Sequence, residues 1–249
     1  MFHVIGMPAL ALAGLLLTFG IVLFALACLV LQLLHRLYNK APTILPVAAF
    51  LGSITTVWAL TLGFMGADVW AVNNQARSAL NEERASIARL QGMAAPDVLD
   101  LPDLEAAVIG YRTAVIEEEW PSGRNRDPAP AVEAAIHAIR LAIVGAIRAD
   151  LPAIFGNKLS SGFEGLQNAR NLRLSVEDGS LSVVKKYLLV FLTVLAHLAI
   201  AAGHADRPPA GRLALAVFAM AATSSLFVLA LLADPYTGGF GIAADRLLE

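Results

Sequence analysis

The chain has 249 residues, of which 57% are hydrophobic and 15% are charged, and its mean hydropathy is +0.67. Soluble domains carry roughly 25% charged residues, so this composition excludes an ordinary soluble protein. The net charge of −2 provides no basic face for phosphates, which excludes a nucleic-acid partner. The single cysteine, Cys28, excludes a disulfide framework and a thiolate metal site.

Charge is concentrated in the middle of the chain. Residues 70–186 carry 13 of the 18 Lys and Arg and 15 of the 20 Asp and Glu. A soluble fold could not bury the two long apolar stretches on either side, so they predict membrane spans. We therefore expect three parts: a first transmembrane hairpin at 1–69, a helical soluble domain at 70–186, and a second transmembrane hairpin with a C-terminal tail at 187–249.

Four apolar tracts predict four transmembrane helices. They lie at about 7–34, 44–67, 187–203 and 213–233, and each can cross most or all of a hydrocarbon core of roughly 30 Å at about 1.5 Å per residue. The first tract lacks the basic start of a secretory signal and exceeds its usual length, so we interpret it as a retained span.

The basic residues of the short loops predict the orientation. Arg36 and Lys40 follow the first tract, and Arg207 and Arg212 flank the turn before the fourth. Because such residues stay in the cytoplasm, we expect a bacterial inner-membrane protein with its soluble domain on the periplasmic side. Basic residues at the membrane ends of the middle segment oppose this orientation, so a cytoplasmic location of the soluble domain remains an alternative.

The middle segment predicts four helices, at about 69–90, 100–120, 131–150 and 159–177. Apolar residues recur in them at spacings of three and four, which indicates one buried face per helix. Asp100 is the expected N-cap of the second helix. The fold class is therefore an all-α integral membrane protein, with a four-helix soluble bundle inserted between spans two and three.

The second span carries a stripe that could line a pore. Its members recur at spacings of three and four and would form a hydrophobic constriction ending in a carboxylate. A carboxylate at a span boundary can select cations, and it can also be only hydrated. The pore-lining candidates are Phe50, Ile54, Val57, Thr61, Phe64 and Asp68.

An acidic string in the soluble segment is the clearest candidate for ion pairing or ion binding. Carboxylates at a helix C-terminus oppose the helix dipole, which indicates a local cationic partner. Arginines three residues apart on the last helix of this segment are the expected partners. The candidate residues are Glu117, Glu118, Glu119, Arg170, Arg173 and Glu177.

The remaining candidate is His197, which lies in the middle of the third span. An ionisable residue there can be functional, although a neutral imidazole bonded to a neighbouring helix would serve equally well. The chain has no nucleophile elbow, phosphate loop, zinc-ligand spacing or dinucleotide fingerprint. We therefore expect no catalytic residues, no cofactor and no metal, and do not expect an enzyme.

Short motifs across most of the chain resemble the bacterial bestrophin-like domain family. They are Gly63-Phe64, Trp70, Ala76-Arg77, Glu82-Glu83, Tyr111, Glu118-Glu119-Trp120-Pro121, Arg170, Arg173-Leu174, Asp234-Pro235-Tyr236 and Gly239. Bestrophins are pentameric chloride channels with cytosolic helical regions, so the resemblance implies an ion channel and a cytoplasmic middle segment. No calcium clasp can be matched to residues of this chain.

Three functions are compatible with these sequence features. The first is an ion channel for anions, formed by oligomerisation around the second span. The second is a non-catalytic accessory or scaffolding subunit of a larger membrane complex. The third is a ligand-sensing membrane protein. The expected partners are the lipid bilayer and either further copies of this chain or a larger membrane complex.

Overall fold

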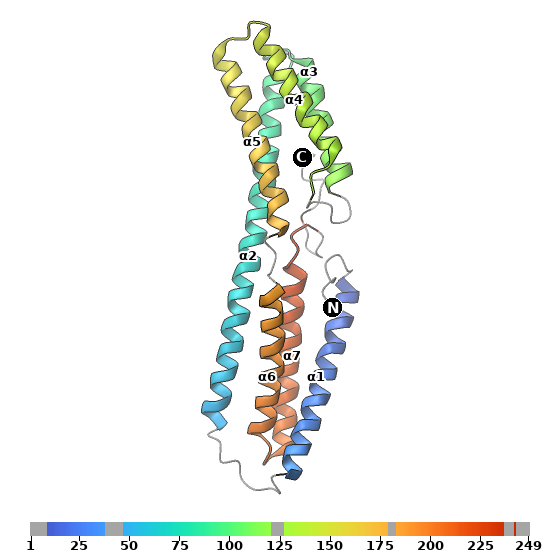
Figure 1. The fold of residues 1–249 in the computed structure, drawn as a ribbon, viewed down its shortest axis with the longest axis vertical. Helices are drawn as coiled ribbons and strands as arrows, with labels where there is room; N and C mark the ends of the chain where they lie inside the picture. The colour runs from blue at the N-terminus through green and yellow to red at the C-terminus, as the bar shows by residue number, and fades with distance from the viewer. Residues whose placement is uncertain (1–8, 38–46, 121–126, 179–182, 237–241, 243–249) are drawn as a thin grey trace. The chain divides into compact units, whose positions relative to one another are not determined.

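The regular structure of the described residues is entirely helical. The computed structural model describes residues 9–37, 47–120, 127–178, 183–236 and 242, and no strand occurs among them. The elements, in chain order, are α1 (Ala9–Leu37), α2 (Val47–Ala94), α3 (Pro102–Ala114), the π-helical turn η1 (Val115–Glu119), α4 (Pro130–Arg148), α5 (Ala153–Asp178), α6 (Val183–Gly203) and α7 (Pro208–Leu232) (Figure 1). The predicted all-α class is confirmed.

The helices form two compact units. Unit 1 comprises Met1–Trp70 and Leu181–Ala233, and unit 2 comprises Ala71–Ser180 and Asp234–Glu249. α2 has 48 residues and contributes its first half to unit 1 and its second half to unit 2. No proline interrupts the sequence between Val47 and Ala94, so one helix can continue from unit 1 into unit 2.

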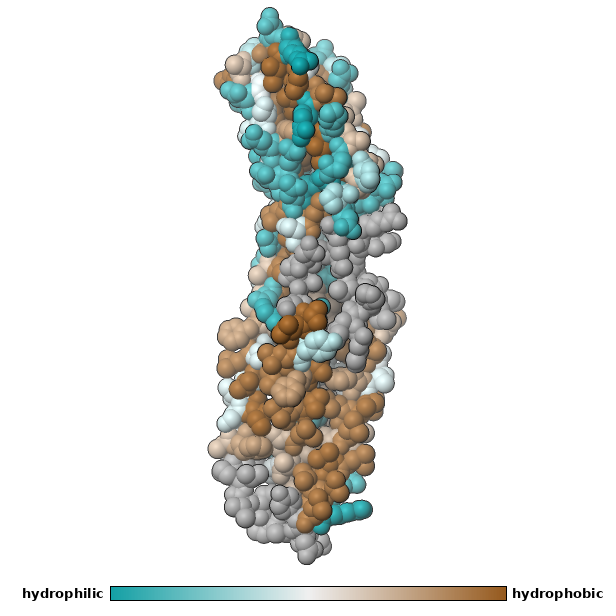
Figure 2. All heavy atoms as spheres, in the orientation of Figure 1, coloured by the Kyte–Doolittle hydropathy of each residue, from teal (hydrophilic) through white to brown (hydrophobic). Residues whose placement is uncertain are grey.

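Unit 1 is built on the close packing of α1, α6 and α7. Gly20 of α1 lies directly against Thr223 of α7, and Gly211 of α7 lies against Leu31 of α1, so a side chain at either glycine would clash with the facing helix. Large apolar side chains cover the outer surface of these helices, and Figure 2 shows them gathered there. An apolar exterior of this kind suits lipid rather than water.

Five described helices are long and apolar enough to cross a membrane. Four are α1, α6, α7 and the part of α2 from Ala49, as expected. The fifth is α4, which we expected in the soluble bundle and which belongs to unit 2. α4 carries Glu133, His137 and Arg140 within its length, and its apolar face is buried in the unit 2 core.

Unit 2 packs the second half of α2 with α3, α4 and α5 around one apolar core. α3 begins with a proline in its first turn, where the missing N–H costs nothing. The expected N-cap was wrong: the cap position is Leu101, and Asp100 has a φ of 50°, in the left-handed region that reverses the chain before the helix. Asp tolerates this conformation better than most residues do.

Candidate functional site

One face of α2 packs inside unit 1, and the other sides of the helix are less covered. Trp58, Met65 and Val69 are buried in a cluster with side chains of α6 and α7. The Trp58 indole N–H donates a hydrogen bond to the hydroxyl oxygen of Thr193 at 2.9 Å. The ring of Trp58 also meets Phe218 edge-on, with 5.1 Å between centroids. These contacts fix how α2 is rotated about its own axis.

The predicted pore-lining stripe lies about a quarter-turn from that buried face, at roughly 100° of helix rotation per residue. Val57 and Phe64 are 51% and 70% exposed. The other four members, Phe50, Ile54, Thr61 and Asp68, are partly buried. Among the helices that could cross a membrane, α2 has the smallest buried share. Part of the stripe, above all Val57 and Phe64, is therefore left uncovered by the described helices of unit 1.

Asp68, at the end of the stripe, is paired with a lysine. Its Oδ2 lies 2.6 Å from Nζ of Lys185, which stands in the first turn of α6. Both side chains are about half exposed. The carboxylate that could select cations is therefore paired with a lysine from another helix of the same unit.

Unit 2 contains a buried cluster of charged side chains, here called the ion-pair cluster and defined as Glu83, Glu119, Arg170 and Arg173. Glu119 joins the two arginines: Arg170 donates to it from Nε and Nη2, and Nη2 of Arg173 lies 2.8 Å from its Oε2. All four residues are at most 3% exposed. Arg170 also donates from Nη1 to Glu133 of α4 at 2.8 Å, and Glu133 opens to solvent.

Glu83 brings α2 and α3 into the same cluster. Arg173 donates from Nε to Glu83 Oε2 at 2.7 Å and from Nη2 to Oε1 at 3.2 Å. The phenol of Tyr111 donates to Glu83 Oε1 at 2.6 Å. The cluster therefore joins α2, η1 and α5, and Tyr111 attaches α3 to it. Its two carboxylates balance its two guanidinium groups.

Burial and pairing act against each other in setting the pKa values of these groups. Burial alone would raise the pKa of Glu119, but hydrogen bonds from Arg170 and the charge of Arg173 outweigh it and hold the pKa below its usual range. Burial, and then the charge of Glu83, raise the pKa of Tyr111 well above its usual value. Glu119 consequently stays ionised, and Tyr111 stays neutral, near pH 7.

The π-helical turn η1 presents Glu119 to the arginines. The amide of Trp120 donates to the carbonyl of Val115, five residues earlier, at 3.0 Å, and this widened turn follows directly on α3. Glu117 and Glu118 lie on the same turn but are exposed. Of the three adjacent glutamates, only Glu119 is brought to the arginines. The side chain of Glu177 lies outside the described residues.

A segment that follows α7 closes over the cluster. The hydroxyl of Tyr236 donates to the backbone carbonyl of Arg173 at 3.2 Å, and the tyrosine ring meets Trp120 edge-on. The guanidinium of Arg173 lies over the Trp120 ring, 5.4 Å from its centroid. Asp234 Oδ1 accepts the backbone N–H of Tyr236 at 2.9 Å and fixes the turn.

The site residues predicted from the sequence did not include Glu83, Glu133 or Tyr236. A signal for Glu83 exists in the sequence, because it stands at a stripe position between Leu80 and Ile87, where apolar residues are expected. A carboxylate in a buried stripe requires a partner. Tyr236 was marked only as part of the Asp234-Pro235-Tyr236 motif of the family resemblance, and its contact with Arg173 depends on the chain returning from α7 to unit 2.

His197 is buried in unit 1, 1% exposed. Its Nδ1 lies 2.8 Å from the carbonyl oxygen of Thr193, one turn earlier on α6, and its ring meets Phe218 edge-on. Among the described residues, no group bonds to its Nε2. The imidazole is therefore tied to its own helix and to the ring that also contacts Trp58.

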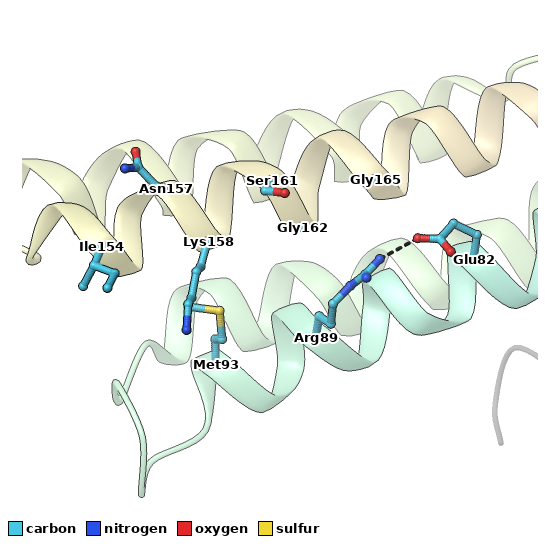
Figure 3. A pocket seen from close by; sticks show the side chains of 9 residues that line it. All are labelled: Glu82, Arg89, Met93, Ile154, Asn157, Lys158, Ser161, Gly162 and Gly165. Atoms are coloured by element: carbon cyan, nitrogen blue, oxygen red, sulfur yellow. Dashed lines mark hydrogen bonds and ion pairs between the residues drawn. The ribbon is translucent and has the colours of Figure 1, made fainter.

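A groove of about 700 Å³ lies between α2 and α5 in unit 2 (Figure 3). On its α2 side, Nη2 of Arg89 contacts Glu82 at 2.6 Å and Ser86 at 2.8 Å. On its α5 side, a Cβ at Gly162 or Gly165 would press against α2, so these glycines permit close helix contact. We therefore interpret the groove as space between two packed helices, next to the exposed Arg89–Glu82 ion pair, and not as a ligand site. Within the described residues, no group of three or more His, Cys, Asp or Glu side chains could hold a metal ion.

Comparison with known proteins finds matches that cover most of the chain. A family model for the bestrophin-like domain matches residues 17–247. Two crystal structures of single-substitution variants of a bacterial bestrophin homologue from Klebsiella pneumoniae are similar. One covers 93% of this chain and 94% of its own, with a TM-score of 0.71 and 14% identity. The other covers 92% and 94%, with a TM-score of 0.72 and 13% identity.

A zinc-phased structure of the same homologue has a TM-score of 0.67 and 12% identity, over 93% of this chain and 94% of its own. At these identities the likeness concerns the fold. None of the curated proteins matches the sequence.

Proposed function

Because the chain belongs to the bestrophin-like family, we propose that it is an ion channel for anions, assembled from several copies around α2. The apolar stripe on α2, in which Val57 and Phe64 are exposed and the other members are partly buried, carries this proposal. α2 is the least covered of the helices that could cross a membrane. In a ring of copies, Phe50, Ile54, Val57, Thr61 and Phe64 form a hydrophobic constriction, which gates ions by excluding water.

Small residues on α2 support assembly from several copies. A Cβ added at Gly52, Gly63 or Gly66 would meet no atom within 4 Å, so packing among the described residues does not require these glycines. Gly20 and Gly211 differ, because each touches a facing helix of the same unit. Small residues on a span let a second helix approach closely, and a neighbouring copy is the helix that we propose.

We further propose that four helices span the bilayer and that α4 does not. α4 buries Val132, Ile136 and Ile139 in the unit 2 core. Glu133 pairs with Arg170, and the guanidinium of Arg140 lies over the ring of Phe163 on α5. Charged groups inside a span are costly unless they serve a site, whereas a helix of a soluble bundle carries them on its outer face.

Ion flux through liposomes containing the purified protein tests the channel. We expect chloride flux from the wild type and a changed rate for Phe64→Ala, which widens the constriction. Phe191→Ala is the matched control, because Phe191 is an equally exposed phenylalanine on α6, 61% against 70%, and lies outside the stripe. The proposal is wrong if the wild type passes neither chloride nor cations.

The side of the membrane that unit 2 occupies can be measured with one labelled position. The charges of the short loops predict the periplasmic side, and the bestrophin resemblance implies the cytoplasm. Glu118 is exposed, so Glu118→Cys in a Cys28→Ser background accepts a membrane-impermeant maleimide wherever the reagent reaches it. Labelling of spheroplasts places unit 2 outside, and labelling only after permeabilisation places it inside.

A further inference from the structure

The Asp68–Lys185 pair stands at the end of the proposed pore face. Asp68 follows Thr61 and Phe64 at spacings of three and four, so the three residues lie on one side of α2. Between residues 49 and 70, Asp68 is the only charged residue of α2. Its carboxylate lies 2.6 Å from the ammonium group of Lys185 on α6.

The pair is accessible rather than sealed in the core. The side chains of Lys185 and Asp68 are 52% and 46% exposed. An ion passing this position would meet one negative and one positive charge from each copy, and the two largely cancel. A ring of bare carboxylates would instead attract cations, and a ring of bare ammonium groups would attract anions.

We infer that the Asp68–Lys185 pair determines ion preference, with Lys185 masking a carboxylate that would otherwise favour cations. The inference rests on the channel function proposed above and adds to it a residue outside the α2 stripe. Lys185 acts here through its positive charge, which lies next to Asp68 at the end of the stripe.

The two partners predict opposite effects. Lys185→Gln leaves Asp68 unpaired and lowers the permeability ratio of chloride to sodium. Asp68→Asn leaves Lys185 unpaired and raises that ratio. Each shift should be about threefold or more, the factor produced by one unit charge within about 6 Å of an ion in water-like surroundings. The double variant Asp68→Asn/Lys185→Gln restores neutrality and should return the ratio to about the wild-type value.

These variants should fold, because a half-exposed ion pair contributes little to stability. Two controls separate the pair from general charge effects. Lys185→Arg keeps the positive charge next to Asp68 and should preserve the wild-type ratio. Lys186→Gln removes the adjacent lysine, which changes the net charge by the same amount without freeing Asp68, and should shift the ratio less than Lys185→Gln does.

The experiment measures reversal potentials of the purified full chain in planar bilayers under a sodium chloride gradient. Opposite shifts in the two single variants, cancelled in the double variant, support the inference. If the wild type conducts and both single variants keep its ratio, the inference is overturned and the channel function stands. If the wild type does not conduct, the channel proposal fails and this inference fails with it.

Discussion

Replacing Arg173 by methionine should destabilise the protein strongly. The guanidinium is fully buried and donates to Glu83 at 2.7 and 3.2 Å and to Glu119 at 2.8 Å. Arg173→Met keeps much of the side-chain volume and removes the charge. The ion-pair cluster then holds two carboxylates and one arginine. Breaking a buried ion pair by removing one partner costs about 3–5 kcal/mol, because the remaining charge has no counter-ion.

For a chain of this length, that loss corresponds to a fall in melting temperature of roughly 6–20 °C, at about 2–4 °C per kcal/mol. Circular dichroism at 222 nm on detergent-purified protein measures it. Arg89→Met is the matched control, because Arg89 and Glu82 form an exposed pair, 54% and 57% accessible, which contributes only about 0–1 kcal/mol.

A second substitution tests the reason for the effect. In Glu83→Gln/Arg173→Met the cluster again has equal numbers of carboxylates and guanidinium groups. If uncompensated charge is the cause, the double variant should be more stable than Arg173→Met alone. The reasoning is refuted if Arg173→Met melts within about 2 °C of the Arg89→Met control, a difference worth no more than about 1 kcal/mol.

Three further predictions concern other contacts. The pKa of Glu119 is lower in the folded protein than its unfolded value near 4.5. Its ionised carboxylate therefore stabilises the fold above about pH 4.5, and this stabilisation is lost as the pH falls through the folded pKa. In acid melts, the stability of Glu119→Gln should depend less steeply on pH below about pH 4.5 than that of the wild type. Trp58→Phe removes the hydrogen bond to Thr193 and should lower stability by about 1 kcal/mol in thermal melts, whereas an unchanged melt would mean that the bond contributes nothing. Gly211→Ala places a Cβ 2.8–2.9 Å from side chains of α1 and the α6–α7 turn and should cost about 1–3 kcal/mol, while Gly14→Ala, which meets nothing within 4 Å, should melt like the wild type.

The helical class was predictable from the sequence because it depends on local patterns. Apolar tracts of span length and stripes at spacings of three and four identify helices without knowledge of their neighbours. Helix ends were less predictable. Val183 begins α6 four residues before the expected start at Tyr187, since Lys185 and Lys186 can extend their stems while their charges reach solvent or a partner.

The site was only partly predictable, because its members come together through tertiary contacts. The spacing of Arg170 and Arg173 indicates one helix face, but it does not indicate which of three adjacent glutamates they meet. That choice depends on the widened turn of η1, and short sequence patterns do not mark π-helical turns. The pairing of Asp68 with Lys185 depends on α6 packing beside α2, which spacing along either helix cannot reveal.

The return of the chain to unit 2 after α7 affects the order in which the protein can fold. Residues 71–180 are synthesised before α6 and α7, yet Tyr236, which bonds to the backbone of Arg173, is synthesised after both. Domains generally fold as units during synthesis, but part of unit 2 is synthesised only after two further helices, α6 and α7. The contact that Tyr236 makes with the backbone of Arg173 is therefore added to unit 2 only after α7 has been synthesised.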